Sequence, residues 1–258
     1  ERRGQSFTNI TSTSDEFGFV VTQLTPNGDI LAIATTSTDG PEGLYGYTAV
    51  YKYSTESDLW EFIGGRIPGF NEYTYSKAIS LSADGTVVAV GNPSEIGQGQ
   101  VRVYSRDRYC PAEPVDSNLT WCQVGRPLAG GDYEDLFGHS VSLSSDGFFL
   151  AIGAPGIDLQ CGGPSCFKTG VYKYFVSTNE WRPYGQTLYG GSGFGHLVYL
   201  SPDAGTLAVA EVGGSDTAYS VHLYEMQRGV WQLSFTLTGS IFGYGGYISM
   251  DLSGSSPY

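Results

Sequence analysis

Basic residues are few in this chain: 13 Lys and Arg stand against 26 Asp and Glu, which gives a formal net charge of −13. Nucleic-acid phosphates and anionic membrane surfaces are bound by clustered Lys and Arg, so this balance excludes nucleic acid as a partner. Cations and neutral sugars remain compatible with it. Long apolar runs are also missing: no segment approaches the ~20 residues that cross a bilayer as a helix, so we expect no membrane insertion.

The sequence also lacks an initiating Met and an apolar leader, because it begins at Glu1. We therefore expect a processed or partial chain. Charged residues make up only 15% of the chain, whereas Gly occurs 37 times and Tyr 19 times. This composition is typical of a turn-rich β protein and disfavours a helical fold.

Cysteine occurs four times, in two close pairs. Neither pair has the C-x-x-C spacing of a redox motif or the paired spacing of a zinc finger. We predict the disulfides Cys110–Cys122 and Cys161–Cys166, with four free thiols in a cytosolic protein as the alternative.

Two N-x-S/T sequons predict glycosylation at Asn9 and Asn118. Asn118 lies between two of the cysteines, where we expect a surface loop. Together with the predicted disulfides, the sequons favour a secreted glycoprotein, located outside the cell or on its surface.

One motif recurs along the chain at Phe17-Gly18, Tyr75-Ser76, Phe137-Gly138, Phe194-Gly195 and Phe242-Gly243. The four tryptophans keep the same period, at positions 60, 121, 181 and 231. Periods of this length indicate tandem structural units. Each unit reads as four strands, A to D. An Asn-Gly or Asp-Gly turn joins A to B, a variable loop joins B to C, and strand D starts at the Trp.

Side-chain size changes across each unit in the same way. Strands A and B carry Gly, Ala and Ser between apolar residues, whereas strands C and D carry Tyr, Trp and Phe. Propeller blades need this gradient, since they converge at an axis and widen outward. We therefore interpret the Trp and Tyr residues as packing residues in preference to residues that stack on a sugar. The prediction is an all-β fold, a β-propeller of four-stranded antiparallel blades.

The ends of the sequence set the phase of the repeat. Arg3-Gly4-Gln5 resembles Tyr184-Gly185-Gln186, the tail of a strand D. We expect one propeller domain over 1–258 with four complete blades and partial blades at its ends. The predicted segments are the end of a blade at 1–14, blades at 15–65, 66–128, 129–190 and 191–240, and the start of another at 241–258. Such a ring does not close, so we expect a longer chain or a partner that covers the gap.

The third copy, Phe137 to Pro155, resembles the FG-GAP repeat of integrin α-subunit propellers. It is more similar still to FG-GAP-like tandem repeats of secreted proteins from algae, oomycetes and marine bacteria. The resemblance implies a propeller that binds partners outside the cell. The integrin-type calcium loop between strands A and B is shortened here to turns such as Ser144-Ser145-Asp146-Gly147. These turns offer too few oxygen ligands for Ca²⁺, so those sites are not expected.

Two histidines, His139 and His196, follow Phe-Gly at the same repeat position. They could share a metal near the axis, or simply pack and form hydrogen bonds. The third, His222, lies on a strand C and out of reach, and two histidines without a fixed carboxylate make a poor metal site.

Three carboxylates, Asp132, Glu134 and Asp135, cluster before a strand A. They could bind Ca²⁺, the one cofactor we consider, or they could cap the turn.

The D–A and B–C loops share one face of a propeller, and the B–C loops here are long and varied. We expect a protein or glycan partner on that face, within a larger assembly.

No G-x-S-x-G elbow is present and the acids lie mainly in loops, so we expect no enzyme. The predicted function is a non-catalytic extracellular module for adhesion, recognition or assembly of a surface or filament structure. The alternatives are a structural subunit docked through its incomplete ring, and a glycosidase-like enzyme with paired carboxylates.

Overall fold

The computed structural model describes most of the repeat units of the chain. The described residues are 4, 21–35, 46–69, 78–94, 97–106, 121–131, 134–156, 167–213 and 218–240. The elements within them are strands joined by turns, and no α-helix occurs in these ranges.

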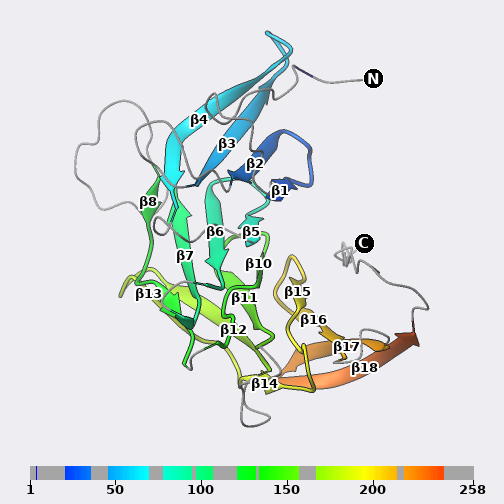
Figure 1. Ribbon diagram of the computed structural model, residues 1–258. Helices are drawn as coiled ribbons and strands as arrows, with labels where there is room; N and C mark the ends of the chain where they lie inside the picture. The colour runs from blue at the N-terminus through cyan, green and yellow to red at the C-terminus, as the bar shows by residue number, and fades with distance from the viewer. Residues whose placement is uncertain are drawn as a thin grey trace.

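Four antiparallel sheets follow one another around an arc, and we number them blades 1 to 4 in chain order (Figure 1). Blade 1 contains β1 (Val21–Leu24), β2 (Ile30–Thr35), β3 (Tyr47–Ser54) and β4 (Leu59–Pro68). Blade 2 contains β5 (Ala78–Leu81), β6 (Val87–Asn92), β7 (Gln100–Ser105), β8 (Cys122–Gln123) and β9 (Leu128–Ala129). Blade 3 contains β10 (Ser140–Leu143), β11 (Phe149–Ala154), β12 (Lys168–Phe175), β13 (Glu180–Pro183) and β14 (Leu188–Tyr189). Blade 4 contains β15 (Leu197–Leu200), β16 (Thr206–Val212), β17 (Ala218–Gln227) and β18 (Val230–Ser240).

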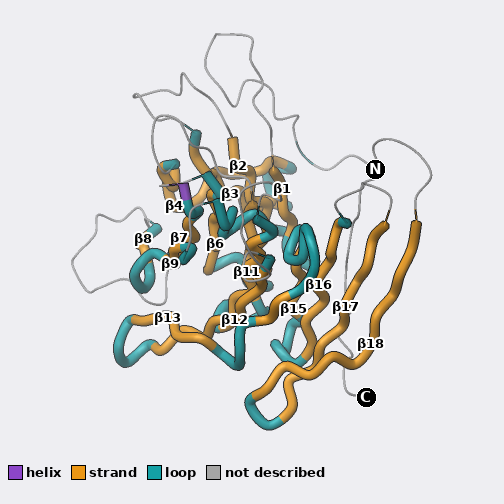
Figure 2. The backbone as a smooth tube through the Cα atoms, turned by 60° about the horizontal axis from the view of Figure 1, so that its bottom comes forward, coloured by secondary structure: helices purple, strands orange, loops and turns teal. Residues whose placement is uncertain are grey.

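Within each blade the strands pair in sequence order, A to D, from the axis outward. In blades 2 and 3 the short strands β9 and β14 add a second segment beside β7 and β12. The prediction of an all-β propeller with four complete four-stranded blades is therefore confirmed. Figure 2 shows the strands of blade 4 lying side by side, with β18 at the margin.

Tight turns join strands A and B at the predicted positions. In blades 1 to 3 the turn glycine has a φ of 76°, 66° or 73°, a left-handed conformation that Gly adopts at little cost. In blade 4 Ala204 takes this conformation instead, at φ 57°. A Ser or Thr hydroxyl donates to the Asn or Asp side chain two residues later in all four turns. The distances are 2.7 Å for Thr25–Asn27, 2.7 Å for Ser82–Asp84, 2.6 Å for Ser144–Asp146 and 2.6 Å for Ser201–Asp203.

A ladder of hydrogen bonds joins the innermost strands across the blade boundaries. A side chain on strand A of one blade accepts from a leucine N–H on strand A of the next. The distances are 2.7 Å from Leu81 N to Gln23 Oε1, 2.9 Å from Leu143 N to Ser80 Oγ, and 2.9 Å from Leu200 N to Ser142 Oγ. Small polar residues on strand A therefore bond neighbouring blades near the axis.

Each tryptophan packs against a glycine of the preceding repeat. The pairs are Gly4–Trp60, Gly64–Trp121, Gly125–Trp181 and Gly185–Trp231. A Cβ atom on Gly125 would lie 2.6 Å from Trp181 Cδ1, so a larger residue would displace the ring. The Trp181 Nε1–H donates to the Val124 carbonyl at 3.1 Å. Indole rings that pack directly on the main chain of a glycine thus fill the space between neighbouring blades near their outer strands.

Three hydrophobic clusters complete the core, and each spans two adjacent blades. In the cluster between blades 3 and 4, Val171 and Leu188 pack with Leu207, Val209 and other buried residues. Because the core lies between sheets, each blade is stabilised by its neighbours.

Candidate functional site

A cavity of about 320 Å³ opens between blades 3 and 4, on the face of the D–A and B–C loops. The described residues that line it are Leu136, His139, Pro155, Gly156, Phe167, Ser192, Gly193, His196, Val212 and Gly213. Two of the three histidines of the chain are among them. None of these lining residues is a Lys, Arg, Asp or Glu. The residue types therefore offer imidazole and hydroxyl chemistry in an otherwise apolar recess.

The histidines are placed by the Phe-Gly turns that precede strands β10 and β15. Gly138 and Gly195 have φ of 88° and 91°, which strongly favours glycine there. Gly153 of strand β11 faces the second turn so closely that a Cβ on it would lie 2.0 Å from Gly195 O. The glycines of the repeat therefore bring one blade's turn against the preceding blade's strand B, and the histidine follows directly.

The two imidazole rings lie next to each other. Their centroids are 4.7 Å apart, with planes inclined by 42°. His139 Nδ1 is 3.1 Å from the main-chain carbonyl of His196. A carbonyl oxygen only accepts, so Nδ1 carries the hydrogen, and in a neutral ring Nε2 is then the accepting nitrogen.

His196 is half-buried, and burial lowers the pKa of its imidazole below the ordinary value. Burial therefore favours the neutral form of this ring. A neutral imidazole can accept a proton from water, which is what a general base does. From their shared repeat position we expected these two histidines to lie close together, either as metal ligands or as packing residues. The structure confirms their proximity, and the described residues contain no group of three or more His, Cys, Asp or Glu that could hold a metal.

The acidic cluster has a different arrangement from a calcium site in the part that is described. Asp135 is fully buried, and its Oδ2 lies 2.7 Å from Lys168 Nζ and accepts from Gly131 N at 2.9 Å. A lysine at this distance already balances the carboxylate charge. Asp132 lies outside the described residues, so the three-carboxylate site stays a prediction.

Blade 4 contains a contact between a carboxylate and an imidazole that sequence reasoning missed. Glu211 Oε2 lies 3.2 Å from His222 Nε2 and accepts from Gly191 N at 3.2 Å. His222 Nδ1 is 3.2 Å from Thr236 Oγ1. In both blades a carboxylate beside a lysine or imidazole side chain therefore caps a Gly-Gly turn that precedes strand A. The repeat alignment places both Gly-Gly pairs before Phe-Gly, but it gives no signal for Glu211 and His222, because their contact depends on the register of two strands.

The remaining predicted sites fall largely outside the described ranges. This holds for Asn9, Asn118, Cys110 and the Cys161–Cys166 pair. Cys122 is disulfide-bonded, and its pairing with Cys110 stays a prediction.

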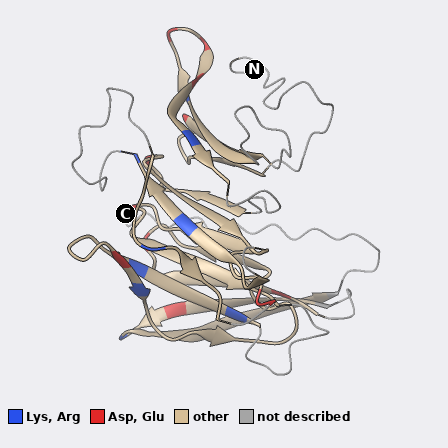
Figure 3. Cartoon of the chain, turned by 60° about the vertical axis from the view of Figure 1, so that its left-hand side comes forward, with Lys and Arg blue, Asp and Glu red and all other residues tan. Residues whose placement is uncertain are grey.

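Lys, Arg, Asp and Glu occupy few positions on the described strands, as the colouring of Figure 3 shows. No described segment is a helix long and apolar enough to cross a membrane. A second cavity, of about 420 Å³, lies on the opposite face around the axis ends of strands A. Its described lining consists of serines, leucines, prolines and a few other residues, and Tyr199 is the one among them that titrates in the ordinary pH range.

Comparison with known proteins gives similarity in structure alone. No family model and no curated protein matches the sequence. A protein of Bacteroides uniformis named as a 6-phosphogluconolactonase matches with a TM-score of 0.54 and 11% identity, over 92% of this chain and 61% of its own. The periplasmic gluconolactonase of Pseudomonas aeruginosa matches at 0.54 and 19%, over 87% and 58%. Hydrazine synthase of Kuenenia stuttgartiensis matches at 0.50 and 15%, over 92% and 52%.

This chain spans about three fifths of the length of the first two of these propellers. At such identities the likeness shows the fold alone. It nevertheless corrects two expectations, the non-catalytic adhesion module and the absence of enzymatic activity, because the similar propellers bear the names of enzymes. The reason for the error is physical: the repeat motif specifies blade packing, and it carries no information on which loops form a site.

Proposed function

We propose that this chain forms part of a hydrolase that opens the lactone ring of a neutral sugar acid, in the cavity between blades 3 and 4. The observation that carries the proposal is the pair of imidazoles, 4.7 Å apart, lining an uncharged cavity of about 320 Å³. The names of the similar propellers support this substrate class.

The charge of the site favours a neutral lactone over a phosphorylated one. The chain carries a net charge of −13, and the described lining residues include no Lys or Arg. A phosphate group needs cationic partners, which these residues do not supply. The same lining holds no carboxylate pair, which a glycosidase would need on either side of its substrate.

Lactone opening needs a base for water and a proton for the leaving oxygen. His139 Nε2 accepts a proton from water as the water oxygen attacks the lactone carbonyl carbon. The ring C–O bond then breaks, and the imidazolium returns the proton to the departing oxygen, which becomes the hydroxyl of the product acid. The His196 carbonyl orients His139 by accepting its Nδ1–H, and the neutral His196 ring covers one side of the recess. Positioned bases of this kind contribute ~10²- to 10⁴-fold to a rate.

An exported location fits this proposal. The disulfide at Cys122 and the two sequons favour an oxidising compartment, and one similar propeller is periplasmic.

The test is a pH-stat assay of glucono-δ-lactone and its 6-phosphate, each corrected for spontaneous opening. We expect hydrolysis of the neutral lactone, reduced at least ~100-fold by His139→Ala. His222→Gln replaces a histidine outside the cavity and should leave the rate unchanged. Failure of the native protein to exceed the spontaneous rate would refute the proposal, as would full activity of His139→Ala.

A further inference from the structure

Strand β18 is the outermost strand of blade 4, and among the described strands it pairs with β17 alone. It is 11 residues long. Three of its large apolar side chains stand in solvent: Leu233 is 56% exposed, Phe235 56% and Leu237 58%. Both Figure 1 and Figure 2 place this strand at the edge of the molecule.

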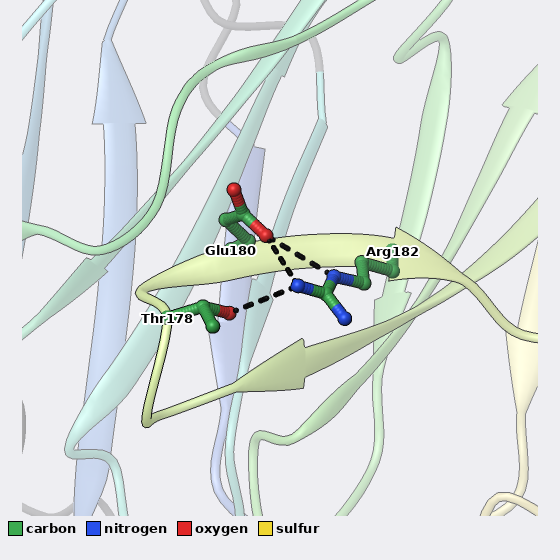
Figure 4. A network of polar contacts seen from close by, with 3 residues as sticks. All are labelled: Thr178, Glu180 and Arg182. Atoms are coloured by element: carbon green, nitrogen blue, oxygen red, sulfur yellow. Dashed lines mark hydrogen bonds and ion pairs between the residues drawn. The ribbon is translucent and has the colours of Figure 1, made fainter.

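Exposed edge strands usually carry devices that prevent pairing with another chain: short length, charge, Pro or a bulge that twists the edge. The outer strands of the other blades have them. Strand β13 has four residues, ends in Pro183, and carries the ion pair of Glu180 with Arg182 at 2.7 Å (Figure 4). Strand β8 has two residues.

Strand β4 is as long as 10 residues, but it includes Glu61, Arg66, Pro68 and two positive-φ glycines. Strand β18, by contrast, reads Val-Trp-Gln-Leu-Ser-Phe-Thr-Leu-Thr-Gly-Ser, without Pro or any charged residue. Its one irregularity is a shift of register opposite Leu223 and Tyr224. In a chain with 26 acidic residues, an uncharged edge of this length is a departure from the surrounding surface.

Blade 4 also departs from the repeat on this strand. In the other blades the fourth residue after the Trp is a glycine, Gly64, Gly125 or Gly185, and the next blade's Trp is seated on it. After Trp231 the corresponding residue is Phe235. The seat for a further Trp is therefore replaced by an exposed aromatic side chain in a continuous strand.

We propose that β18 is a dimerisation edge, at which two copies of this chain pair antiparallel through β18 of each. An antiparallel pair of identical strands has two-fold symmetry, so the same edge serves both copies. Phe235 is the midpoint of Val230–Ser240, and full overlap sets it opposite its own copy. Main-chain hydrogen bonds would supply the pairing, and the apolar row would be buried.

The absence of charged residues on β18 favours a second copy of this chain as the partner over a different protein. A charged edge would repel its own copy in a symmetric pair, whereas the uncharged β18 is complementary to itself. The remaining surface carries the net charge of −13, so the two copies repel at a distance. Added salt screens that repulsion, and the dimer should therefore strengthen as ionic strength rises.

The test is sedimentation velocity of the full chain over a range of protein and salt concentrations. We expect a species of about twice 27.7 kDa, and Phe235→Lys should raise the dissociation constant at least ~100-fold, because it places two like charges opposite each other at the centre of the pair. Leu59→Lys changes a residue of comparable exposure, 44%, on the charged strand β4, and should leave the dimer intact.

Hydrogen exchange distinguishes strand pairing from other contacts. In the dimer, amides of 230–240 should exchange more slowly than in Phe235→Lys, and amides of 59–68 should not change. A native chain that sediments as a monomer at every concentration, or a Phe235→Lys variant that dimerises as the native chain does, overturns the proposal. A dimer without added protection over 230–240 overturns it as well.

Discussion

Replacing Gly153 by Ala tests whether close backbone contact between blades positions the turn that holds His196. The added Cβ would lie 2.0 Å from Gly195 O and 2.3 Å from Ser140 Oγ. Real Cβ contacts essentially never fall below 3.0 Å, so the two backbones must separate by at least 1.0 Å, the difference between these distances. Overpacking of this kind costs about 3 kcal/mol, the upper end of its usual range, because the obstacle is main chain and cannot rotate away.

The assay is thermal or urea denaturation followed by tryptophan fluorescence, since each indole lies at a blade boundary. A loss of about 3 kcal/mol corresponds to a fall in Tm of roughly 6 to 12 °C for a protein of this size. Gly205→Ala is the matched control, because its Cβ would have ordinary contacts, the nearest at 3.4 Å from Asp203 Oδ1. A Gly153→Ala variant within about 0.5 kcal/mol of the native stability would refute the argument.

Two further predictions concern charged and titratable side chains. Lys168→Met removes the cation 2.7 Å from the buried Asp135 carboxylate and should destabilise the fold by about 3 to 5 kcal/mol, measured by urea denaturation. Adding Asp135→Asn to this variant should restore part of the lost stability. A double variant that recovers none of it would count against the ion pair. Burial lowers the pKa of His196, so the unfolded chain binds this proton more readily than the folded one. Stability should therefore fall as the pH drops from the ordinary value of 6.5 towards the lowered pKa, and His196→Gln should flatten that part of the stability–pH curve; an unchanged slope would contradict it.

The fold could be predicted because the sequence states the same local rule four times. Every blade boundary repeats the same contacts. Each contact requires a particular residue type: Gly at the turn, Gly or Ala on strand B, and Trp at the start of strand D. The structure gives those contacts directly: Gly125 receives Trp181, and Gly153 receives the turn at Gly195. One misreading of a single copy would not have changed the outcome, since the other three copies carry the same signal.

The candidate site could be predicted only in part, because the repeat motif indicates where its residues lie but not what they do. The shared position of His139 and His196 indicated that they would meet, and they do. The repeat motif gave no sign of what the pair does, because the motif specifies blade packing. Asp135 was predicted, together with Asp132 and Glu134, as a calcium ligand or a turn cap. In the structure its carboxylate contacts Lys168, which lies 33 positions further along the chain, and the three-carboxylate site stays a prediction. Pairing across such a distance follows from strand register, which a single sequence does not reveal.

Blade 4 shows how one substitution changes what a repeat can do. In blades 2 and 3 the glycine four residues after the Trp lies between two short segments of strand D and leaves backbone bare for the next indole, as Gly185 does for Trp231. With Phe235 at that position, strand D forms the single strand β18 with one shift of register, and Leu233, Phe235 and Leu237 remain exposed. The same change that removes the seat for another blade thus creates a long, uncharged edge. Restoring the repeat with Phe235→Gly should therefore weaken self-association as Phe235→Lys does, although it introduces no charge, because it removes the apolar contact and a glycine inside a strand weakens that strand.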